Sequence, residues 1–387
     1  MKRHIRLREF SPLTTATYIP SSEYLSRRPN MIRHWGYFVE FDGSGYLKTG
    51  NHIIGKRKIV FLGGSFYENL YVSQNARIPS ILEVLLNSQG YDYEVLNASI
   101  SGLTLLQAFN VIVNKVASNP PDILIMGDLA NEIYPLSHEK IYWNKTRYYS
   151  NLTDYNKNNA SEVDLKLNNI DVREKILNSI IYFCNEFNIK LIFASICNLQ
   201  VEDETFFRVN KKDNELRKIL YKNTEKVAKE KSIPYINVTD YNEKQYFTNM
   251  QDDIHVNSLG AANVADKIHK FILEKYNLKK KSKPIFSEEI SDTFVTAPNR
   301  SKIVYQVSCV SYSRIVVIFD IKCLSEVNTD YVHVKIFGNY KNGIDILPNV
   351  WQQRSVFFDL EKKDNTFPIS FRSNNTLELK NINLIFI

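Results

Sequence analysis

The chain has 387 residues, of which 44% are hydrophobic and 24% charged, and its formal net charge is +7. This length exceeds what one hydrophobic core usually holds, so it predicts two domains. The composition is typical of globular proteins, and no stretch reaches the roughly 18 apolar residues of a membrane span. The basic residues are dispersed, so we expect no nucleic-acid partner. Since no apolar span is present in the sequence, we expect no stable membrane insertion.

The N-terminal residues and the cysteines argue against a secreted protein and against a cysteine metal site. The N-terminus is basic, but no apolar segment follows it as in a secretory signal, so we expect a cytoplasmic location. The four cysteines lack the close spacing of a metal site. No cluster of metal ligands is apparent elsewhere in the sequence, and we expect neither a metal nor a bound cofactor. The pattern makes no prediction of the oligomeric state.

Residues 1–57 have weak periodicity and many turn formers, apart from one short strand expected within 36–46. We interpret this part as an N-terminal extension that packs on the following domain.

From residue 58 to 278 the pattern alternates regularly between strands and helices. Apolar strands are expected at 59–62, 93–96, 123–126, 190–194 and 234–238, and helices at 78–89, 104–117, 170–187, 215–231 and 258–276. Such alternation predicts an α/β fold with a parallel sheet covered by helices on both faces.

An insertion at about 128–168 follows the third strand and is rich in aromatic residues and Asn. It is much longer than an ordinary loop, and it begins at a carboxyl strand end, where ligands bind in such sheets. It is either a lid with a sugar-stacking surface or a segment that packs only on itself.

The lysine-rich segment 279–284 ends in proline and is expected to be a linker. Short strands without helices follow it, at 303–310, 314–321, 331–337, 355–359, 369–371 and 377–387. This spacing predicts a small all-β sandwich over 285–387, which could bind carbohydrate or mediate oligomerisation.

The first predicted strand ends in Gly63-Gly64-Ser65, which would present Ser65 at the carboxyl edge of the sheet. Glycine-rich turns also bind phosphate, but the nucleotide motifs G-x-G-x-x-G and G-x-x-x-x-G-K-[ST] are absent from the sequence. Ser65 is therefore a candidate nucleophile.

A candidate base follows the last strand of the series. His255 lies just before the last helix, and Asp252 three residues earlier could orient its imidazole. Asp253 competes with Asp252 for this role. The alternative for a single histidine is a structural or exposed side chain.

Candidate oxyanion donors follow the second and third strands. Gly102 could bring its backbone N–H to a substrate oxygen, and Asn131 could donate from its amide. With the N–H of Ser65 they would make three donors. Turn glycine and turn cap are the alternative interpretations for Gly102 and Asn131.

The order Ser, Gly, Asn, Asp-x-x-His over residues 58–276 resembles the four blocks of the SGNH (GDSL-like) hydrolase family. The resemblance implies a flavodoxin-like three-layer sheet, with Ser65, Asp252 and His255 as the triad and Ser65, Gly102 and Asn131 as the oxyanion hole. The sequence has Gly-Gly-Ser-Phe in place of Gly-Asp-Ser-Leu, and two extra residues precede Asn131. The Gly-Gly-Ser variant is similar to members linked to bacterial surface polysaccharides.

These features predict a serine enzyme that transfers acyl groups at esters of carbohydrate hydroxyls. The resemblance admits both an O-acetylesterase and an O-acetyltransferase, the latter with acetyl-CoA or another acetyl donor as co-substrate. The aromatic insertion and the β domain favour a saccharide over a lipid. The alternative is a non-catalytic saccharide-binding or scaffold protein whose site has decayed.

Overall fold

The structure is a computed structural model. It describes residues 5, 7–22, 36–51, 53, 55, 57–144, 149, 151, 167, 169–197, 211–239, 246–247, 254–280, 286–308, 314–324, 329–336, 339–346, 351–359 and 366–386.

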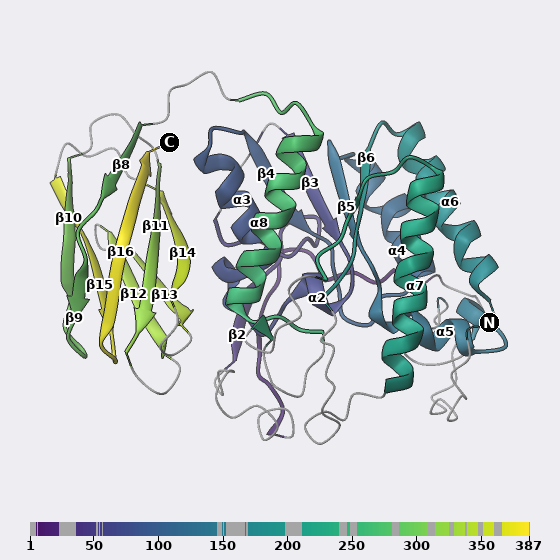
Figure 1. Ribbon diagram of the computed structural model, residues 1–387, viewed down its shortest axis with the longest axis horizontal. Coiled ribbons are helices and arrows are strands. Elements are labelled where there is room, and N and C mark those ends of the chain that lie inside the picture. Colours follow the sequence, from purple (N-terminus) through teal and green to yellow (C-terminus); the bar gives the residue numbers. More distant parts are fainter. Residues whose placement is uncertain are drawn as a thin grey trace.

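A five-stranded parallel sheet forms the centre of the first domain (Figure 1). Its strands lie in the order β4-β3-β5-β6-β7, which is 2-1-3-4-5 in chain order. This is the flavodoxin-like order, so the predicted fold class is confirmed. The strands are β3 (Arg57–Leu62), β4 (Tyr93–Asn97), β5 (Ile123–Gly127), β6 (Lys190–Ala194) and β7 (Tyr235–Ile236).

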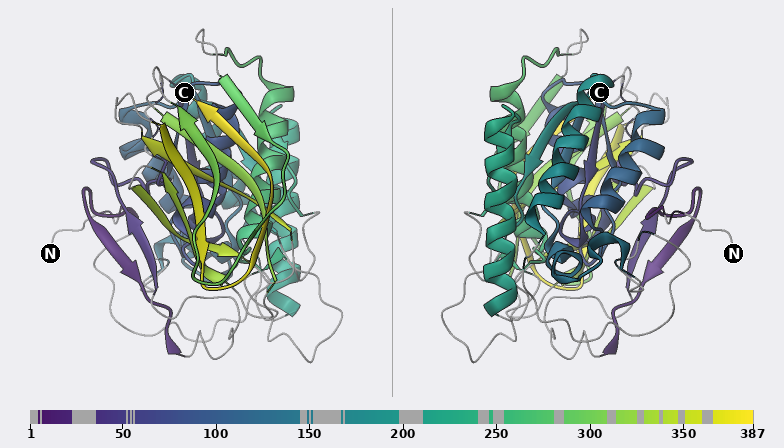
Figure 2. Two further views of the ribbon diagram at one scale, coloured as in Figure 1. Left: turned by 90° about the vertical axis from the view of Figure 1, so that its left-hand side faces the viewer. Right: turned by 90° about the vertical axis from the view of Figure 1, so that its right-hand side faces the viewer.

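Helices cover both faces of this sheet and make three layers (Figures 1 and 2). On one face α3 (Ile78–Ser88) packs against α8 (Ser258–Lys275). On the other, α6 (Ile170–Glu186) packs against both α4 (Leu105–Asn114) and α7 (Lys211–Glu230). Helices on both faces exclude water from the strands, and β5 is buried along its whole length.

The observed elements differ from the predicted ones mainly at their ends. The edge strand β7 has two residues instead of five, and Pro234, which has no N–H to donate, lies directly before it. Helix α7 begins at Lys211, four residues earlier than predicted. The short helix α2 (Ser65–Glu68) is not predicted by periodicity, because one turn is too short to show a 3.6-residue repeat.

The C-terminal part is an antiparallel β-sandwich. One sheet has the order β10-β15-β12-β13, and the other has the order β14-β11-β16-β8, with β9 also paired to β16. The first contains β10 (Lys302–Ser308), β15 (Thr366–Ser373), β12 (Thr329–Ile336) and β13 (Asn339–Ile346). The second contains β14 (Gln352–Asp359), β11 (Arg314–Cys323), β16 (Leu377–Phe386), β8 (Phe286–Ile290) and β9 (Phe294–Thr296).

Three strands of the sandwich, β8, β9 and β13, are missing from the prediction. β13 reads NYKNGIDI, and its Asn and Gly residues are typical of turns rather than strands. β13 is nevertheless a strand because it pairs with β12 through backbone hydrogen bonds at the edge of its sheet.

The sandwich lies beside α3 and α8 (Figure 1). Val84 of α3 is buried together with Ile385 of β16, and Ile318 of β11 packs against them. The guanidinium of Arg354 on β14, itself buried, donates to the Ser258 hydroxyl at 2.5 Å. Ser258 is the first residue of α8, so the sandwich contacts the start of the helix that follows His255.

The N-terminal part contributes a two-stranded antiparallel sheet, β1 (Thr15–Tyr18) with β2 (Tyr37–Glu40). Leu47, which follows it, donates its N–H to the carbonyl of Asn97 at 2.8 Å. Asn97 ends β4, so residues before the main sheet contact its carboxyl edge. In the parts of the chain described above, no helix has the length and apolar character that crossing a bilayer requires.

Candidate active site

Ser65 is the first residue of α2 and follows β3 after two glycines. β3 lies between β4 and β5, so the chain leaves β3 at the point where the strand order reverses, which is where ligands bind in such sheets. The Ser65 side chain is half-buried. Its hydroxyl has no hydrogen bond within the described residues, so it is available to a partner.

The ring of Tyr67 fixes the turn that presents Ser65. Tyr67 is buried, and its hydroxyl donates to the carbonyl of Ser195 at 2.9 Å. A Cβ at Gly127 would lie 2.1 Å from the Tyr67 ring, and one at Gly63 would lie 2.9 Å from it. Both positions therefore need glycine because an aromatic ring occupies the space of their side chains.

The segment that carries Gly102 lies directly beside this turn. Ala98 donates its N–H to the carbonyl of Phe61 at 2.7 Å, and Ile100 donates to Gly63 at 3.0 Å. Gly102 has φ +75°, a conformation that favours glycine. The structure thus brings the loop after β4 next to Ser65, as the prediction requires of an oxyanion donor.

Glu68 is a buried carboxylate that sequence reasoning missed. It lies one helical turn after Ser65, is 2% exposed, and accepts hydrogen bonds from both the N–H (3.0 Å) and the hydroxyl of Ser101. Arg8 donates to the Ser101 carbonyl. Ser101 is therefore held on both sides, directly before Gly102. An acidic residue three positions after the candidate nucleophile was the available signal.

Burial raises the pKa of Glu68 to about 7. The hydrogen bonds from Ser101 and the charges of Arg77 and His255 lower this pKa, but they do not cancel the cost of removing the carboxylate from water. His255 is thus within electrostatic reach of a carboxylate that hydrogen-bonds the Gly102 segment.

His255 is half-buried and lies two residues before the N-cap of α8. The N-cap is Asn257, whose side chain accepts hydrogen bonds from Leu259 N (2.9 Å) and Gly260 N (3.0 Å). These bonds satisfy the free N–H groups at the helix start and fix where the chain enters α8. Asp252 and its competitor Asp253 lie outside the described residues, so the acid partner of His255 stays a prediction.

Asn131 lies after β5 in a short 3₁₀ turn, η3 (Ala130–Glu132), and is half-buried. The next residue, Glu132, is buried, accepts a hydrogen bond from the N–H of Leu105 at 2.8 Å, and accepts another from the Tyr142 hydroxyl. Leu105 begins α4, three residues after Gly102. Glu132, which sequence reasoning also missed, therefore joins the loops of the two candidate oxyanion donors.

The aromatic insertion has two kinds of side chain. Tyr142 is fully buried against Glu132, whereas Trp143 next to it is 54% exposed. The rings of Tyr134 and Tyr149 stack on each other, with their centroids 5.1 Å apart. Among the described aromatic residues of this insertion, Trp143 is the one whose exposure suits contact with a sugar. Tyr148 and Tyr155 lie outside the described residues.

Within the part of the chain that the structure covers, no three His, Cys, Asp or Glu side chains gather as a metal site would require.

A family model described as GDSL-like Lipase/Acylhydrolase matches residues 59–268. The chain belongs to this family. It is a serine esterase of the SGNH type, and such hydrolases need no cofactor. No curated protein matches the chain.

Solved structures of similar proteins include a lipase/acylhydrolase from Enterococcus faecalis, with 18% identity and a TM-score of 0.41 over 59% of this chain and 100% of that one. An acetyl xylan esterase has 17% identity and a TM-score of 0.41, over 56% of this chain and 99% of that one. A carbohydrate acetylesterase family member from Sinorhizobium meliloti has 12% identity and a TM-score of 0.40, over 56% and 98%.

Proposed function

We propose that the protein transfers acyl groups at carbohydrate O-acyl esters through an acyl-Ser65 intermediate, as an O-acetylesterase or O-acetyltransferase. The observation that carries this proposal is how the Ser65 turn and the Gly102 loop are joined. One hydrogen bond before Ser65 (Ile100 to Gly63) and two after it (Ser101 to Glu68) hold the candidate nucleophile and the candidate oxyanion donor together.

In the proposed reaction the Ser65 oxygen attacks the ester carbonyl while its proton passes to Nε2 of His255. The tetrahedral intermediate collapses, the bond to the sugar oxygen breaks, and His255 returns the proton to that oxygen. Water or a second hydroxyl then attacks the acyl-serine, with its proton again taken by His255 and finally given to the Ser65 oxygen. Asp252 would hold the imidazole in the required tautomer.

The developing negative charge would lie among the N–H groups of Ser65 and Gly102 and the amide of Asn131. Removing one donor of this kind typically costs about 10²–10³ in rate. The Asn131 amide makes no hydrogen bond to another described residue. It is therefore available to the substrate.

The carbohydrate specificity rests on side-chain chemistry. Trp143 is exposed and lies in the insertion that begins after β5, and a flat sugar ring could stack on its indole. The β-sandwich is a second unit that could hold a polymer. The cytoplasmic location stays a prediction from the sequence.

The nucleophile is tested with p-nitrophenyl acetate. Ser65→Ala is expected to lose hydrolysis by about 10³-fold or more, because no other group supplies the nucleophile. Ser88→Ala, a half-buried serine at the end of α3, is the matched control and should keep the wild-type rate. Equal rates in Ser65→Ala and wild type would refute the assignment.

Labelling with a fluorophosphonate separates the enzyme from the non-catalytic alternative. The enzyme should form one adduct on Ser65, and a binding protein with a decayed site should form none. Asp252→Asn and Asp253→Asn can then be compared directly, since only the partner of His255 should slow adduct formation strongly.

Esterase and transferase differ in the acceptor. The protein is incubated with acetyl-CoA or p-nitrophenyl acetate together with an oligosaccharide, and the molecular mass of the oligosaccharide is measured by mass spectrometry. A gain of one acetyl group identifies a transferase, and release of acetate without that gain identifies an esterase.

A further inference from the structure

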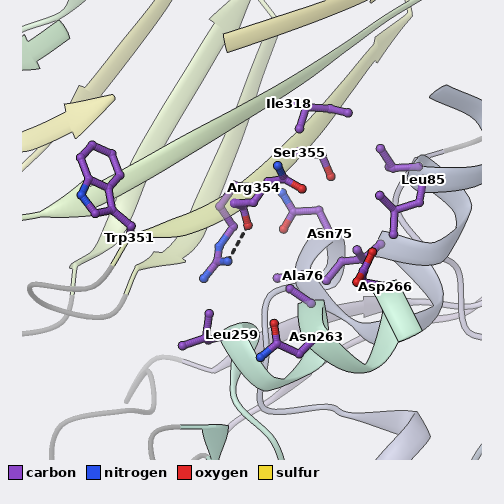
Figure 3. Close-up of a pocket in the computed structure, with 14 residues that line it drawn as sticks. Asn75, Ala76, Leu85, Leu259, Asn263, Asp266, Ile318, Trp351, Arg354 and Ser355 are labelled. Atoms are coloured by element: carbon purple, nitrogen blue, oxygen red, sulfur yellow. Dashed lines mark hydrogen bonds between the residues drawn. The ribbon is translucent and has the colours of Figure 1, made fainter. Parts of the chain in front are cut away.

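A cavity of about 330 Å³ lies between the α/β domain and the β-sandwich (Figure 3). Its walls on one side come from α3, α8 and the 3₁₀ turn η1 (Gln74–Ala76), and on the other from β11 and β14. Cavities that bind small molecules have volumes of about 300–1,000 Å³ and occur preferentially at such domain interfaces. The cavity is separate from Ser65, which does not line it.

The polar groups that line the cavity come from both domains. Figure 3 shows Asn75 and Asn263 on the side of the α/β domain and Arg354 and Ser355 on the side of the sandwich. Trp351 is also among the lining residues, and Lys380 Nζ lies 4.0 Å from its ring centroid. Amides, a hydroxyl and an indole ring are the groups that bind sugar hydroxyls and the apolar face of a sugar ring.

The charged groups at the cavity already have protein partners. Arg354 donates to the Ser258 hydroxyl and the Gln352 side chain, both at 2.5 Å, and to the carbonyl of Gln353 at 2.8 Å. Asp266 pairs with Lys270 at 2.7 Å. The other polar groups of the lining, the amides of Asn75, Asn263 and Gln353 and the hydroxyl of Ser355, are neutral, so the chemistry favours a neutral ligand with many hydroxyl groups.

We propose that this interdomain cavity binds a neutral oligosaccharide segment, apart from the acyl-transfer site. The choice of a saccharide rests on the proposed function, whereas the neutral polar character rests on the lining. The cavity wall includes Leu259 of α8, four residues after His255, and such a stretch of chain spans at most about 14 Å. In the proposed function His255 acts on Ser65, so one polysaccharide chain could occupy the cavity while a sugar further along it presents its ester to Ser65.

The test is calorimetric titration of the full-length Ser65→Ala protein with xylotriose, cellotriose, maltotriose, tri-N-acetylchitotriose and trigalacturonic acid. At least one neutral trisaccharide is expected to bind saturably with one site. Ala262→Phe, which places a ring in the cavity, and Trp351→Ala should each weaken this binding about tenfold or more. Asn263→Ala should weaken it less.

Asn178→Ala on α6, a half-buried helical asparagine outside the cavity, is the matched control for Asn263→Ala and should bind like the parent. In the Ser65-containing protein, Ala262→Phe should leave p-nitrophenyl acetate hydrolysis unchanged, which also shows that it folds. Three outcomes would overturn the proposal. They are no saturable binding, binding of trigalacturonic acid alone, and binding that none of the three substitutions weakens. These outcomes are independent of the acyl chemistry, because binding is measured without Ser65.

Discussion

The carboxylate of Glu68 accepts two hydrogen bonds from Ser101, which precedes Gly102. Since Glu68 lies one turn after Ser65 in α2, this contact couples the position of the candidate nucleophile to that of the candidate oxyanion donor. A change at Glu68 should therefore act on catalysis without touching the reacting atoms.

Glu68→Ala is expected to lower kcat for p-nitrophenyl acetate about 10–100-fold, because the Gly102 N–H is no longer held toward the oxyanion. Both hydrogen bonds go to the same oxygen, and a glutamine can supply an oxygen there. Glu68→Gln should therefore recover most of the rate. KM should change little in either variant.

The matched control for Glu68 is Glu83, which is equally buried but lies in α3 and bonds to Thr49, Asn51 and Val95. Glu83→Ala should lower stability without lowering kcat per folded molecule. A similar kcat loss in both alanine variants would show that Glu68 acts only through general stability.

Stability is expected to fall as the pH rises from about 4.5 to about 7. Burial raises the pKa values of Glu68, Glu83 and Asp128 to about 7, so the folded protein binds more protons in this window than the unfolded chain. The stabilisation is fully present below the unfolded pKa values and is lost above the folded ones. Calorimetric Tm values between pH 4.5 and 8 measure it.

Glu83→Gln should reduce the loss of unfolding free energy between pH 4.5 and 7 by about 1–3 kcal/mol, because one buried titrating group is removed. The exposed Glu274→Gln on α8 is its control and should leave the slope as it is. A rise of Tm across the window in the wild type would contradict the expected sign.

Gly127→Ala should destabilise the protein by about 1–3 kcal/mol or more and lower activity. Its Cβ would lie 2.1 Å from the Tyr67 ring, so the ring and the α2 turn that carries Ser65 must move. Chemical denaturation with activity on the same samples measures both effects. Gly43→Ala, whose Cβ would have its nearest neighbour at 3.9 Å, should be nearly neutral.

Arg354→Met should lower the free energy of unfolding by about 1–3 kcal/mol. The buried guanidinium donates one hydrogen bond across the domain interface, to Ser258 of α8, and another within its own strand, to Gln352. Since Ser258 begins α8 just after His255, the variant should also slow fluorophosphonate labelling of Ser65. An unchanged labelling rate with lowered stability would show that the sandwich does not position His255.

The sequence by itself determined the alternation of strands and helices and the position of Ser65 at the end of β3. Local patterns suffice there, because a buried parallel strand is a short apolar run and the glycines that end it are visible in the sequence. The same holds for Gly102 as a turn glycine, whose φ is +75°. Both features depend on residues that are close together in the chain.

Only the tertiary structure revealed what surrounds these positions. Glu68 and Ser101 are thirty-three residues apart, and Arg354 is ninety-six residues from Ser258. Contacts of this kind arise because separate segments meet when their apolar faces are buried, and no local periodicity records which polar groups then face each other. The tertiary structure therefore decided that a buried glutamate joins the Ser65 turn to the Gly102 loop, and that the sandwich holds the start of the helix after His255.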